Sequence, residues 1–175
     1  MSLTRIDRNQ VSYFFDPKMP PVATAEVGDR VVFHTRDCFN DELLKETDLA
    51  TSIDMSRMNP CTGPLSVKGA SAGSVLAVRI EDIRLRDWGV LTLIPKEGVL
   101  DEYVSGPVTR IVRIRQDAGF VEFAENIRLG LRPHVGTIGT TPAMRYPTGR
   151  TGNHGGNMDI RFAGPGTTLY FPVFV

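Results

Sequence analysis

The feature that most constrains the fold of this chain is its frequent interruption by glycine and proline. Its 175 residues include 17 glycines and 12 prolines, and the apolar stretches between them are short and rich in β-branched and aromatic residues. Such stretches are typical of strands, whereas the apolar spacing of a long helix is missing. Neither a strand-helix-strand rhythm nor an internal repeat is present. We therefore predict a mainly β fold, an antiparallel β-sandwich or barrel with one short helix.

Apolar alternation between turn signals places the expected elements. A helix is expected at residues 39–46, where apolar side chains share one face and Asp37 can serve as the N-cap. The apolar phase slips near Asp82, which predicts a β-bulge or bend there. Strands are expected at residues 11–15, 22–26, 31–33, 65–67, 76–80, 90–94, 108–115, 120–123 and 169–175.

Charge and length limit the classes of protein that this chain can represent. Twenty basic and twenty acidic residues cancel, and no basic run with interleaved aromatic residues is present, which argues against a nucleic-acid or anionic-membrane partner. No apolar stretch approaches the length of a membrane span, and no secretory apolar segment opens the chain. We therefore expect a cytoplasmic protein of one globular domain or two small ones.

A glycine-rich stretch carries the candidate chemistry. The string TGNHGGNMD at residues 151–159 sets one imidazole, one carboxylate and two amides among three glycines. Glycine permits positive φ and close backbone approach, so His154 and Asp159 could turn inward from one tight loop. An ordinary surface turn with an exposed histidine is the alternative.

Four ordered motifs resemble the acetamidase/formamidase family of amide hydrolases. They lie at residues 59–83 (beginning NP and TGP), 132–139 (RPHVGTIG), 152–159 (GNHGGNMD) and 166–173 (GTTLYFPV). The resemblance covers most of the chain from about residue 22 onward. It implies hydrolysis of the C–N bond of small amides such as formamide or acetamide, in a homo-oligomeric enzyme.

The resemblance also bears on the apolar stretch at residues 169–175. The family continues beyond this strand into a segment with further acidic and histidine residues, and an apolar strand invites pairing or covering. We therefore expect one incomplete acetamidase/formamidase-like unit at residues 1–175. A C-terminal fragment or a second subunit would complete it. The competing hypothesis is a noncatalytic β-sandwich binding module, a remnant of the family.

Amide hydrolysis suggests a metal and its ligands. A divalent ion polarises the carbonyl and lowers the pKa of bound water to about 7, and it usually takes about three protein ligands. Asp37 and His154 are the best two candidates, and the resemblance points to the same pair as catalytic and metal-binding residues. We expect zinc, with calcium as the alternative. Asp159, which could orient His154, and His34, which could be a surface residue, are weaker candidates.

Substrate binding is expected at the glycines. Backbone N–H groups of Gly155 and Gly156, with the side-chain amide of Asn157, could donate to the oxyanion that develops on the substrate.

Several of these residues have simpler roles open to them. Asp37 could only cap its helix, and His134 is better read as a packed loop histidine than as a ligand. Cys38 could be a nucleophile, but no neighbouring histidine favours a low thiol pKa. Cys61 lies in a proline- and glycine-rich corner, where packing is the better explanation. Neither cysteine has the spacing of a disulfide or metal motif, so both are expected to be reduced.

Overall fold

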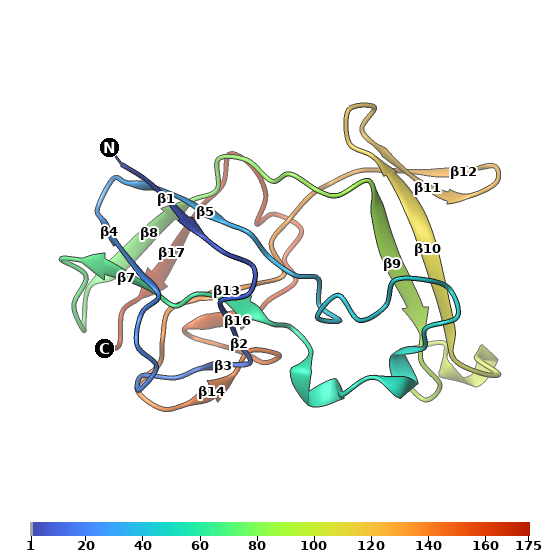
Figure 1. Cartoon of the computed structure of the whole chain (residues 1–175), viewed down its shortest axis with the longest axis horizontal. Helices are drawn as coiled ribbons and strands as arrows, with labels where there is room; N and C mark the ends of the chain where they lie inside the picture. Colours follow the sequence, from blue (N-terminus) through green and yellow to red (C-terminus); the bar gives the residue numbers. More distant parts are fainter. Residues whose placement is uncertain (1) are drawn as a thin grey trace. The chain divides into compact units, whose positions relative to one another are not determined.

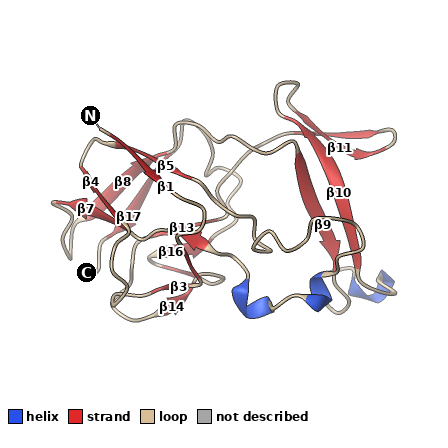
Figure 2. Cartoon of the chain, viewed as in Figure 1, coloured by secondary structure: helices blue, strands red, loops and turns tan. Residues whose placement is uncertain are grey.

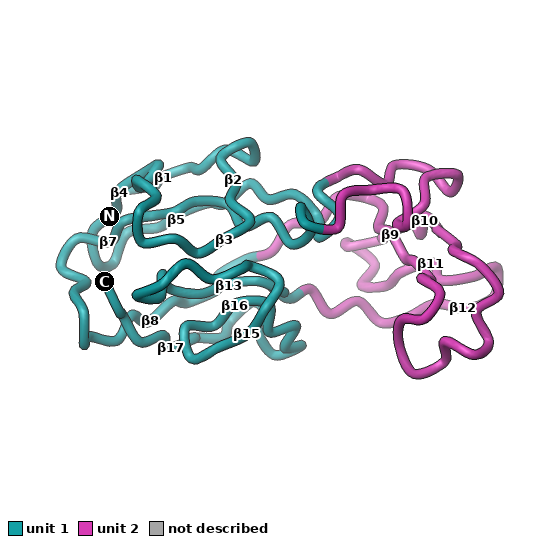
Figure 3. Tube along the Cα trace, turned by 90° about the horizontal axis from the view of Figure 1, so that it is seen from below, with its two compact units in different colours: residues 1–40, 56–82, 134–175 teal, residues 41–55, 83–133 magenta. Residues whose placement is uncertain are grey.

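The computed structural model describes residues 2–175, which fold into two compact units (Figures 1 and 3). Unit 1 comprises Met1–Asn40, Ser56–Asp82 and His134–Val175, and unit 2 comprises Asp41–Met55 and Ile83–Pro133. Figure 2 shows that regular structure is almost entirely strand. The helical segments within residues 2–175 are three 3-10 turns, η1 (Ala50–Ser52), η2 (Met55–Arg57) and η3 (Asp101–Tyr103). No helix in this range is long and apolar enough to cross a membrane.

Unit 1 is assembled from small sheets of two or three strands. Two pairs are parallel, β1 with β5 and β4 with β7, and the others are antiparallel: β2 with β6, β3 with β14, β8 with β17, and the order β13-β16-β15. The strands are β1 (Leu3–Ile6), β2 (Val11–Ser12), β3 (Phe14–Phe15), β4 (Ala23–Glu26), β5 (Arg30–Phe33), β6 (Cys61–Thr62), β7 (Leu65–Lys68), β8 (Val75–Arg79), β13 (Thr137–Gly139), β14 (Tyr146–Pro147), β15 (Thr151–Gly152), β16 (Gly155–Asn157) and β17 (Thr168–Pro172).

The core of unit 1 draws on side chains from all three of its segments, the middle one through Ile80, which is 8% exposed. Ile6 of β1 is fully buried, Phe15 of β3 is 8% exposed and Phe171 of β17 is 5% exposed. Because these side chains come from distant parts of the sequence, burial of apolar surface joins the small sheets into one unit.

Unit 2 is built on one antiparallel sheet in the order β12-β11-β10-β9. Its strands are β9 (Trp88–Leu93), β10 (Val108–Arg115), β11 (Phe120–Ala124) and β12 (Ile127–Gly130). Consecutive strands pair with one another, and the register shifts between Glu122 and Ala124. The side chains of Val112 and Leu43 are buried in this unit.

The predicted mainly β fold is confirmed, with three corrections. The chain forms no closed barrel within residues 2–175, and two strand pairs are parallel. The strands β1, β6 and β12 to β16 were not expected. The strands at β4 and β5 are present, but they pair with β7 and β1 and not with each other. The β-bulge or bend expected near Asp82 is not formed; the phase slip coincides instead with the end of β8 at Arg79 and the passage into unit 2.

The helix expected at residues 39–46 is not formed. Residues 38–41 are turns, and Asn40 (φ 60°) and Asp41 (φ 59°) both take left-handed conformations. A right-handed helix cannot pass through two such residues. Asp37 accordingly caps no helix, and its Oδ1 accepts the Phe39 N–H at 3.0 Å within the turn.

Candidate functional site

His154 lies in the tight loop between β15 and β16, and its side chain is almost completely buried. The residue is 2% exposed. Its ring packs edge-on against two aromatic rings. The ring centroids are 5.0 Å apart for Phe15, with an angle of 73° between the ring planes, and 4.8 Å apart for Tyr146, with an angle of 71°. The Nε2 atom is buried and has no hydrogen-bond partner within residues 2–175. Burial lowers the pKa of His154 below its ordinary value of 6.5, which favours the neutral imidazole.

The two glycines after His154 are required by close packing. Gly155 (φ 102°) and Gly156 (φ 89°) are both left-handed and buried in β16, between β13 and β15. A Cβ on Gly155 would lie 2.8 Å from Cε1 of Phe171, and one on Gly156 would collide with the Arg150 carbonyl oxygen. The inward turn expected from the glycines is present for His154, whereas Asp159, expected to turn inward with it, is exposed. The role of the two glycines as oxyanion donors stays a prediction.

Asn157 ends β16 with its side chain bound to the neighbouring strand. Thr137 of β13 stands directly opposite Asn157, and the Thr137 Oγ1 donates to Oδ1 of Asn157 at 2.9 Å. The backbone N–H of Asn157 donates to the Arg150 carbonyl at 3.3 Å. Its side-chain amide group, and not its backbone N–H, is thus the group left available for a ligand.

Asp159 follows β16 with φ 49° and lies over Gly136. A Cβ on Gly136 would be 2.7 Å from Oδ1 of Asp159 and 3.9 Å from Oδ1 of Asn157. The Gly136 carbonyl accepts the backbone N–H groups of Met158 at 2.9 Å and Asp159 at 3.1 Å. The loop before β13 therefore holds both side chains over one glycine.

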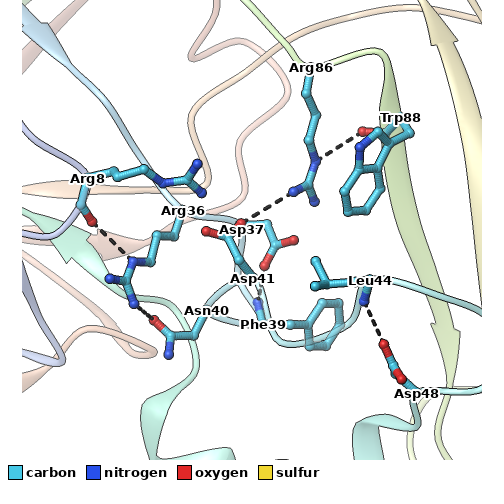
Figure 4. Close-up of polar contacts among 10 residues, drawn as sticks. All are labelled: Arg8, Arg36, Asp37, Phe39, Asn40, Asp41, Leu44, Asp48, Arg86 and Trp88. Carbon is cyan, nitrogen blue, oxygen red and sulfur yellow. Dashed lines mark hydrogen bonds and ion pairs between the residues drawn. The ribbon is translucent and has the colours of Figure 1, made fainter.

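The turn that carries Asp37 and Cys38 is held by Arg36 (Figure 4). The Arg36 guanidinium donates to three neutral oxygens: the Arg8 carbonyl at 3.1 Å, Asn40 Oδ1 at 2.9 Å and Asn9 Oδ1 at 2.9 Å. The Cys38 carbonyl accepts the Asn59 N–H at 2.8 Å. These contacts fix the backbone on both sides of Asp37.

The thiol of Cys38 is poorly suited to nucleophilic attack. Desolvation, followed by the negative charge of Asp37 and, more weakly, that of Asp159, raises the pKa of Cys38 to about 11. The residue is nevertheless exposed, while its thiolate is disfavoured.

The residues expected to bind a metal do not form a complete site. The buried, unpartnered Nε2 of His154 is the kind of atom that a ligand could satisfy. Residues 2–175 contain no group of three or more His, Cys, Asp and Glu side chains placed to hold a metal ion. The donor set of this chain therefore does not by itself fit a metal.

The remaining candidates lie in ordinary positions. His34 and His134 are exposed, so packing does not account for His134. Cys61 is a free thiol, and burial raises its pKa to about 11, in agreement with a packing role. Sequence reasoning missed Arg36 and Thr137 as supports of the site. The Asn-Asp pair at residues 40–41, which tolerates left-handed backbone, was the available signal for the turn.

Comparison with known proteins places these features in a family. The model of the acetamidase/formamidase family matches residues 4–151. Among solved structures, an acetamidase from Bacillus halodurans shares 40% identity with a TM-score of 0.94, and an acetamidase/formamidase from Thermoanaerobacter tengcongensis shares 34% with a TM-score of 0.93. They cover 98% and 99% of this chain. An acetamidase from Yersinia enterocolitica shares 30% identity with a TM-score of 0.88.

The chain spans only part of the length of these relatives. It covers 58% of the two acetamidase-type structures first named and 57% of the Yersinia enterocolitica acetamidase. A formamidase homologue of Schizosaccharomyces pombe is 27% identical over 136 residues, which make up 33% of that protein. Because the family match covers most of its residues, the chain belongs to the acetamidase/formamidase family.

Proposed function

We propose that this chain takes part in hydrolysing the C–N bond of small linear amides, such as formamide and acetamide, to a carboxylate and ammonia. The family match supports amide hydrolysis as the reaction class. The observation that carries the proposal to this chain is the glycine hairpin, whose Asn157 and Asp159 side chains lie over Gly136. Hydrolysis of an amide needs donors to its carbonyl oxygen and groups that move protons to and from water and nitrogen.

The residues divide these tasks by their chemistry. Asp37, held on a fixed turn, is the carboxylate proposed to accept a proton from the attacking water. The side-chain amide of Asn157 supplies hydrogen-bond donors for the developing oxyanion. His154, neutral and buried, is proposed as the second catalytic residue through its unpartnered Nε2.

A divalent metal, zinc or calcium, would polarise the carbonyl and activate water if it were bound. His154 and Asp37 are the proposed ligands in this chain, and at least one further donor has to come from outside the described residues. We therefore propose that a C-terminal fragment or second subunit completes the site in a cytoplasmic homo-oligomer. Because the donor set is incomplete, none of the steps assigned above depends on the metal.

Ammonia release from formamide and acetamide tests the proposal, with metal content measured on the same samples. The chain combined with the fragment or subunit that completes the site should release ammonia, Asp37→Asn should abolish the release, and Asp101→Asn in unit 2 should not. A chelator should abolish it as well if the metal takes part. Binding of acetamide without any ammonia release would instead favour the noncatalytic binding module.

A further inference from the structure

We propose that one face of the unit 2 sheet, together with the loop that joins β9 to β10, is the surface through which two copies of this chain pair about a two-fold axis. The inference assigns an interface to the homo-oligomer proposed above. It rests on the geometry of unit 2 and not on amide hydrolysis, so it is tested by mass and not by activity.

The strand registers of unit 2 place its exposed large apolar strand residues on one face of the sheet. Residues opposite each other in an antiparallel pair share a face, and so do residues two apart in one strand. Leu93 of β9 lies opposite Val108 of β10. Ile114, six residues beyond Val108, lies opposite Val121 of β11, which in turn lies opposite Leu129 of β12. The side chains on this face that are 38% to 53% exposed, here called the apolar face, are Leu91, Leu93, Val108, Ile127 and Leu129.

The opposite face of the same sheet carries most of the charged strand residues. Arg113 stands opposite Glu122, and Glu122 stands opposite Arg128. Arg115 donates to the Glu122 carboxylate at 2.9 Å across this face. An antiparallel sheet commonly turns a charged face to water and covers the other one. In unit 2 the apolar face is exposed as well, so it is the face that calls for a partner.

The loop between β9 and β10 extends the apolar face. It begins directly after Leu93, the last residue of β9, which pairs with the first residue of β10, Val108 (Figure 1). Its side chains Val99, Leu100 and Tyr103 are 63% to 95% exposed. Together with the apolar face they present on the order of 800 Å², the area that one partner buries in a standard-size interface. Monomeric proteins seldom expose an apolar patch of that extent.

The charges on this surface favour a second copy of the chain as the partner. Arg110 is the charged strand residue on the apolar side of the sheet; its guanidinium lies 5.9 Å from the centroid of the Phe123 ring, and it forms no ion pair with any described residue. Glu102 in the loop has no basic partner among those residues either. A surface that holds unpaired charges of both signs can complement itself across a two-fold axis. The chain has twenty basic and twenty acidic residues, so two copies carry no net charge with which to repel each other.

The arrangement of the two copies follows from these positions. Two sheets that pack face to face lie about 10 Å apart and bury their inner side chains between them. A two-fold axis that runs across the strands places the loop of each copy over the sheet of the other. Each Glu102 then approaches the Arg110 of the other copy, while the leucines and valines of both apolar faces form a shared core.

Sedimentation equilibrium of the purified chain tests the loop half of the surface. The chain should have twice the mass of one copy at high concentration and dissociate on dilution. Val99→Asp should raise the dissociation constant at least tenfold, because a two-fold interface would bury the added carboxylate twice. Val27→Asp is the matched control, since Val27 is also an exposed turn valine but belongs to unit 1, and it should leave the dissociation constant unchanged.

Three further variants test the sheet half of the surface and its charges. Leu129→Asp should weaken the dimer at least tenfold, with near-ultraviolet circular dichroism confirming that the fold is kept. Arg110→Glu should weaken it severalfold, because the substitution places like charges at the loop of the other copy. Adding Glu102→Arg to Arg110→Glu should restore the dissociation constant of the unsubstituted chain.

The outcomes separate this inference from the proposed function. A chain that sediments as a monomer at every concentration overturns the inference, and so does a dimer that Val99→Asp leaves intact or that Val27→Asp weakens equally. Loss of the dimer in Arg110→Glu without restoration by Glu102→Arg overturns the two-fold arrangement. Ammonia release is measured separately, so a dimer with the expected order of variants supports the inference even where the hydrolytic proposal fails.

Discussion

The reactivity of Cys38 tests the electrostatics around Asp37 directly. The thiol is exposed, yet desolvation and the charges of Asp37 and Asp159 raise its pKa from 9.0 to about 11. At pH 8 this shift lowers the thiolate fraction about a hundredfold. A more basic thiolate is more nucleophilic, with a Brønsted coefficient of about 0.4 to 0.5, so the rate constant of the thiolate itself rises roughly tenfold. We therefore expect Cys38 to react with a disulfide reagent about tenfold more slowly than an unperturbed thiol.

The assay uses a Cys61→Ser background, so that Cys38 is the sole thiol, and follows release of the chromophore from an aromatic disulfide. The same chain in denaturant supplies the unperturbed rate. Asp37→Asn and Asp159→Asn should each accelerate the native reaction and lower the midpoint of its pH profile, whereas Asp101→Asn should change neither. Native Cys38 reacting as fast as the denatured thiol would refute the reasoning, as would equal pH midpoints in all variants.

Three further predictions concern stability. Gly156→Ala should lower the free energy of unfolding by about 2 kcal/mol or more, since its φ is positive and its Cβ would meet a backbone carbonyl, whereas Gly130→Ala should change it little in the same denaturant titration. Burial lowers the pKa of His154, so the unfolded chain binds a proton at this residue more readily than the folded chain does. Thermal unfolding should therefore show that the stability contributed by neutral His154 is complete above pH 6.5 and declines as the pH falls below it. His154→Gln should lose this pH dependence. The guanidinium carbon of Arg86 lies 3.5 Å from the ring centroid of the single tryptophan, Trp88 (Figure 4). Arg86→Lys should therefore destabilise unit 2 by about 1 kcal/mol, measured by urea unfolding followed by tryptophan fluorescence.

Most strands could be predicted because apolar, β-branched stretches between turn residues mark them in the local sequence. The strand expected at residues 108–115 has these bounds in β10, where β-branched residues are frequent between turn residues. Pairing partners were not predictable in the same way. The strands β4 and β5 flank a tight turn, yet each pairs in parallel with a strand elsewhere in unit 1. Such pairings depend on contacts distant in sequence, which no local pattern encodes.

The failed helix prediction shows tertiary contacts overriding local preference. The apolar spacing at residues 39–46 suits a helix, but the Asn40 side chain accepts hydrogen bonds from both Arg36 and Tyr13, at 2.9 and 3.2 Å. These bonds hold Asn40, 5% exposed, in a left-handed conformation. Propensity is a weak prior in such a setting.

The part of the candidate site that depends on the backbone conformation of the glycines was predictable. The inward turn at His154 followed from the glycines around it, since only glycine tolerates the positive φ and close contacts found at Gly155 and Gly156. The partners of Asn157 and Asp159 were not predictable. Thr137 lies 20 residues before Asn157, and their pairing requires the register of β13 against β16.

The division of unit 1 among three chain segments has a consequence for how the protein forms during synthesis. Unit 2 pairs its neighbouring strands through local hairpins, so its sheet can close once residues 83–133 have been made. Unit 1 has to wait, because β8 pairs with β17 and β3 pairs with β14 across that whole insertion. Contacts of high sequence separation form slowly. The unpaired edges of β3 and β8 therefore stay open while the inserted unit emerges, and this is the interval in which a chaperone would be of most use to the nascent chain.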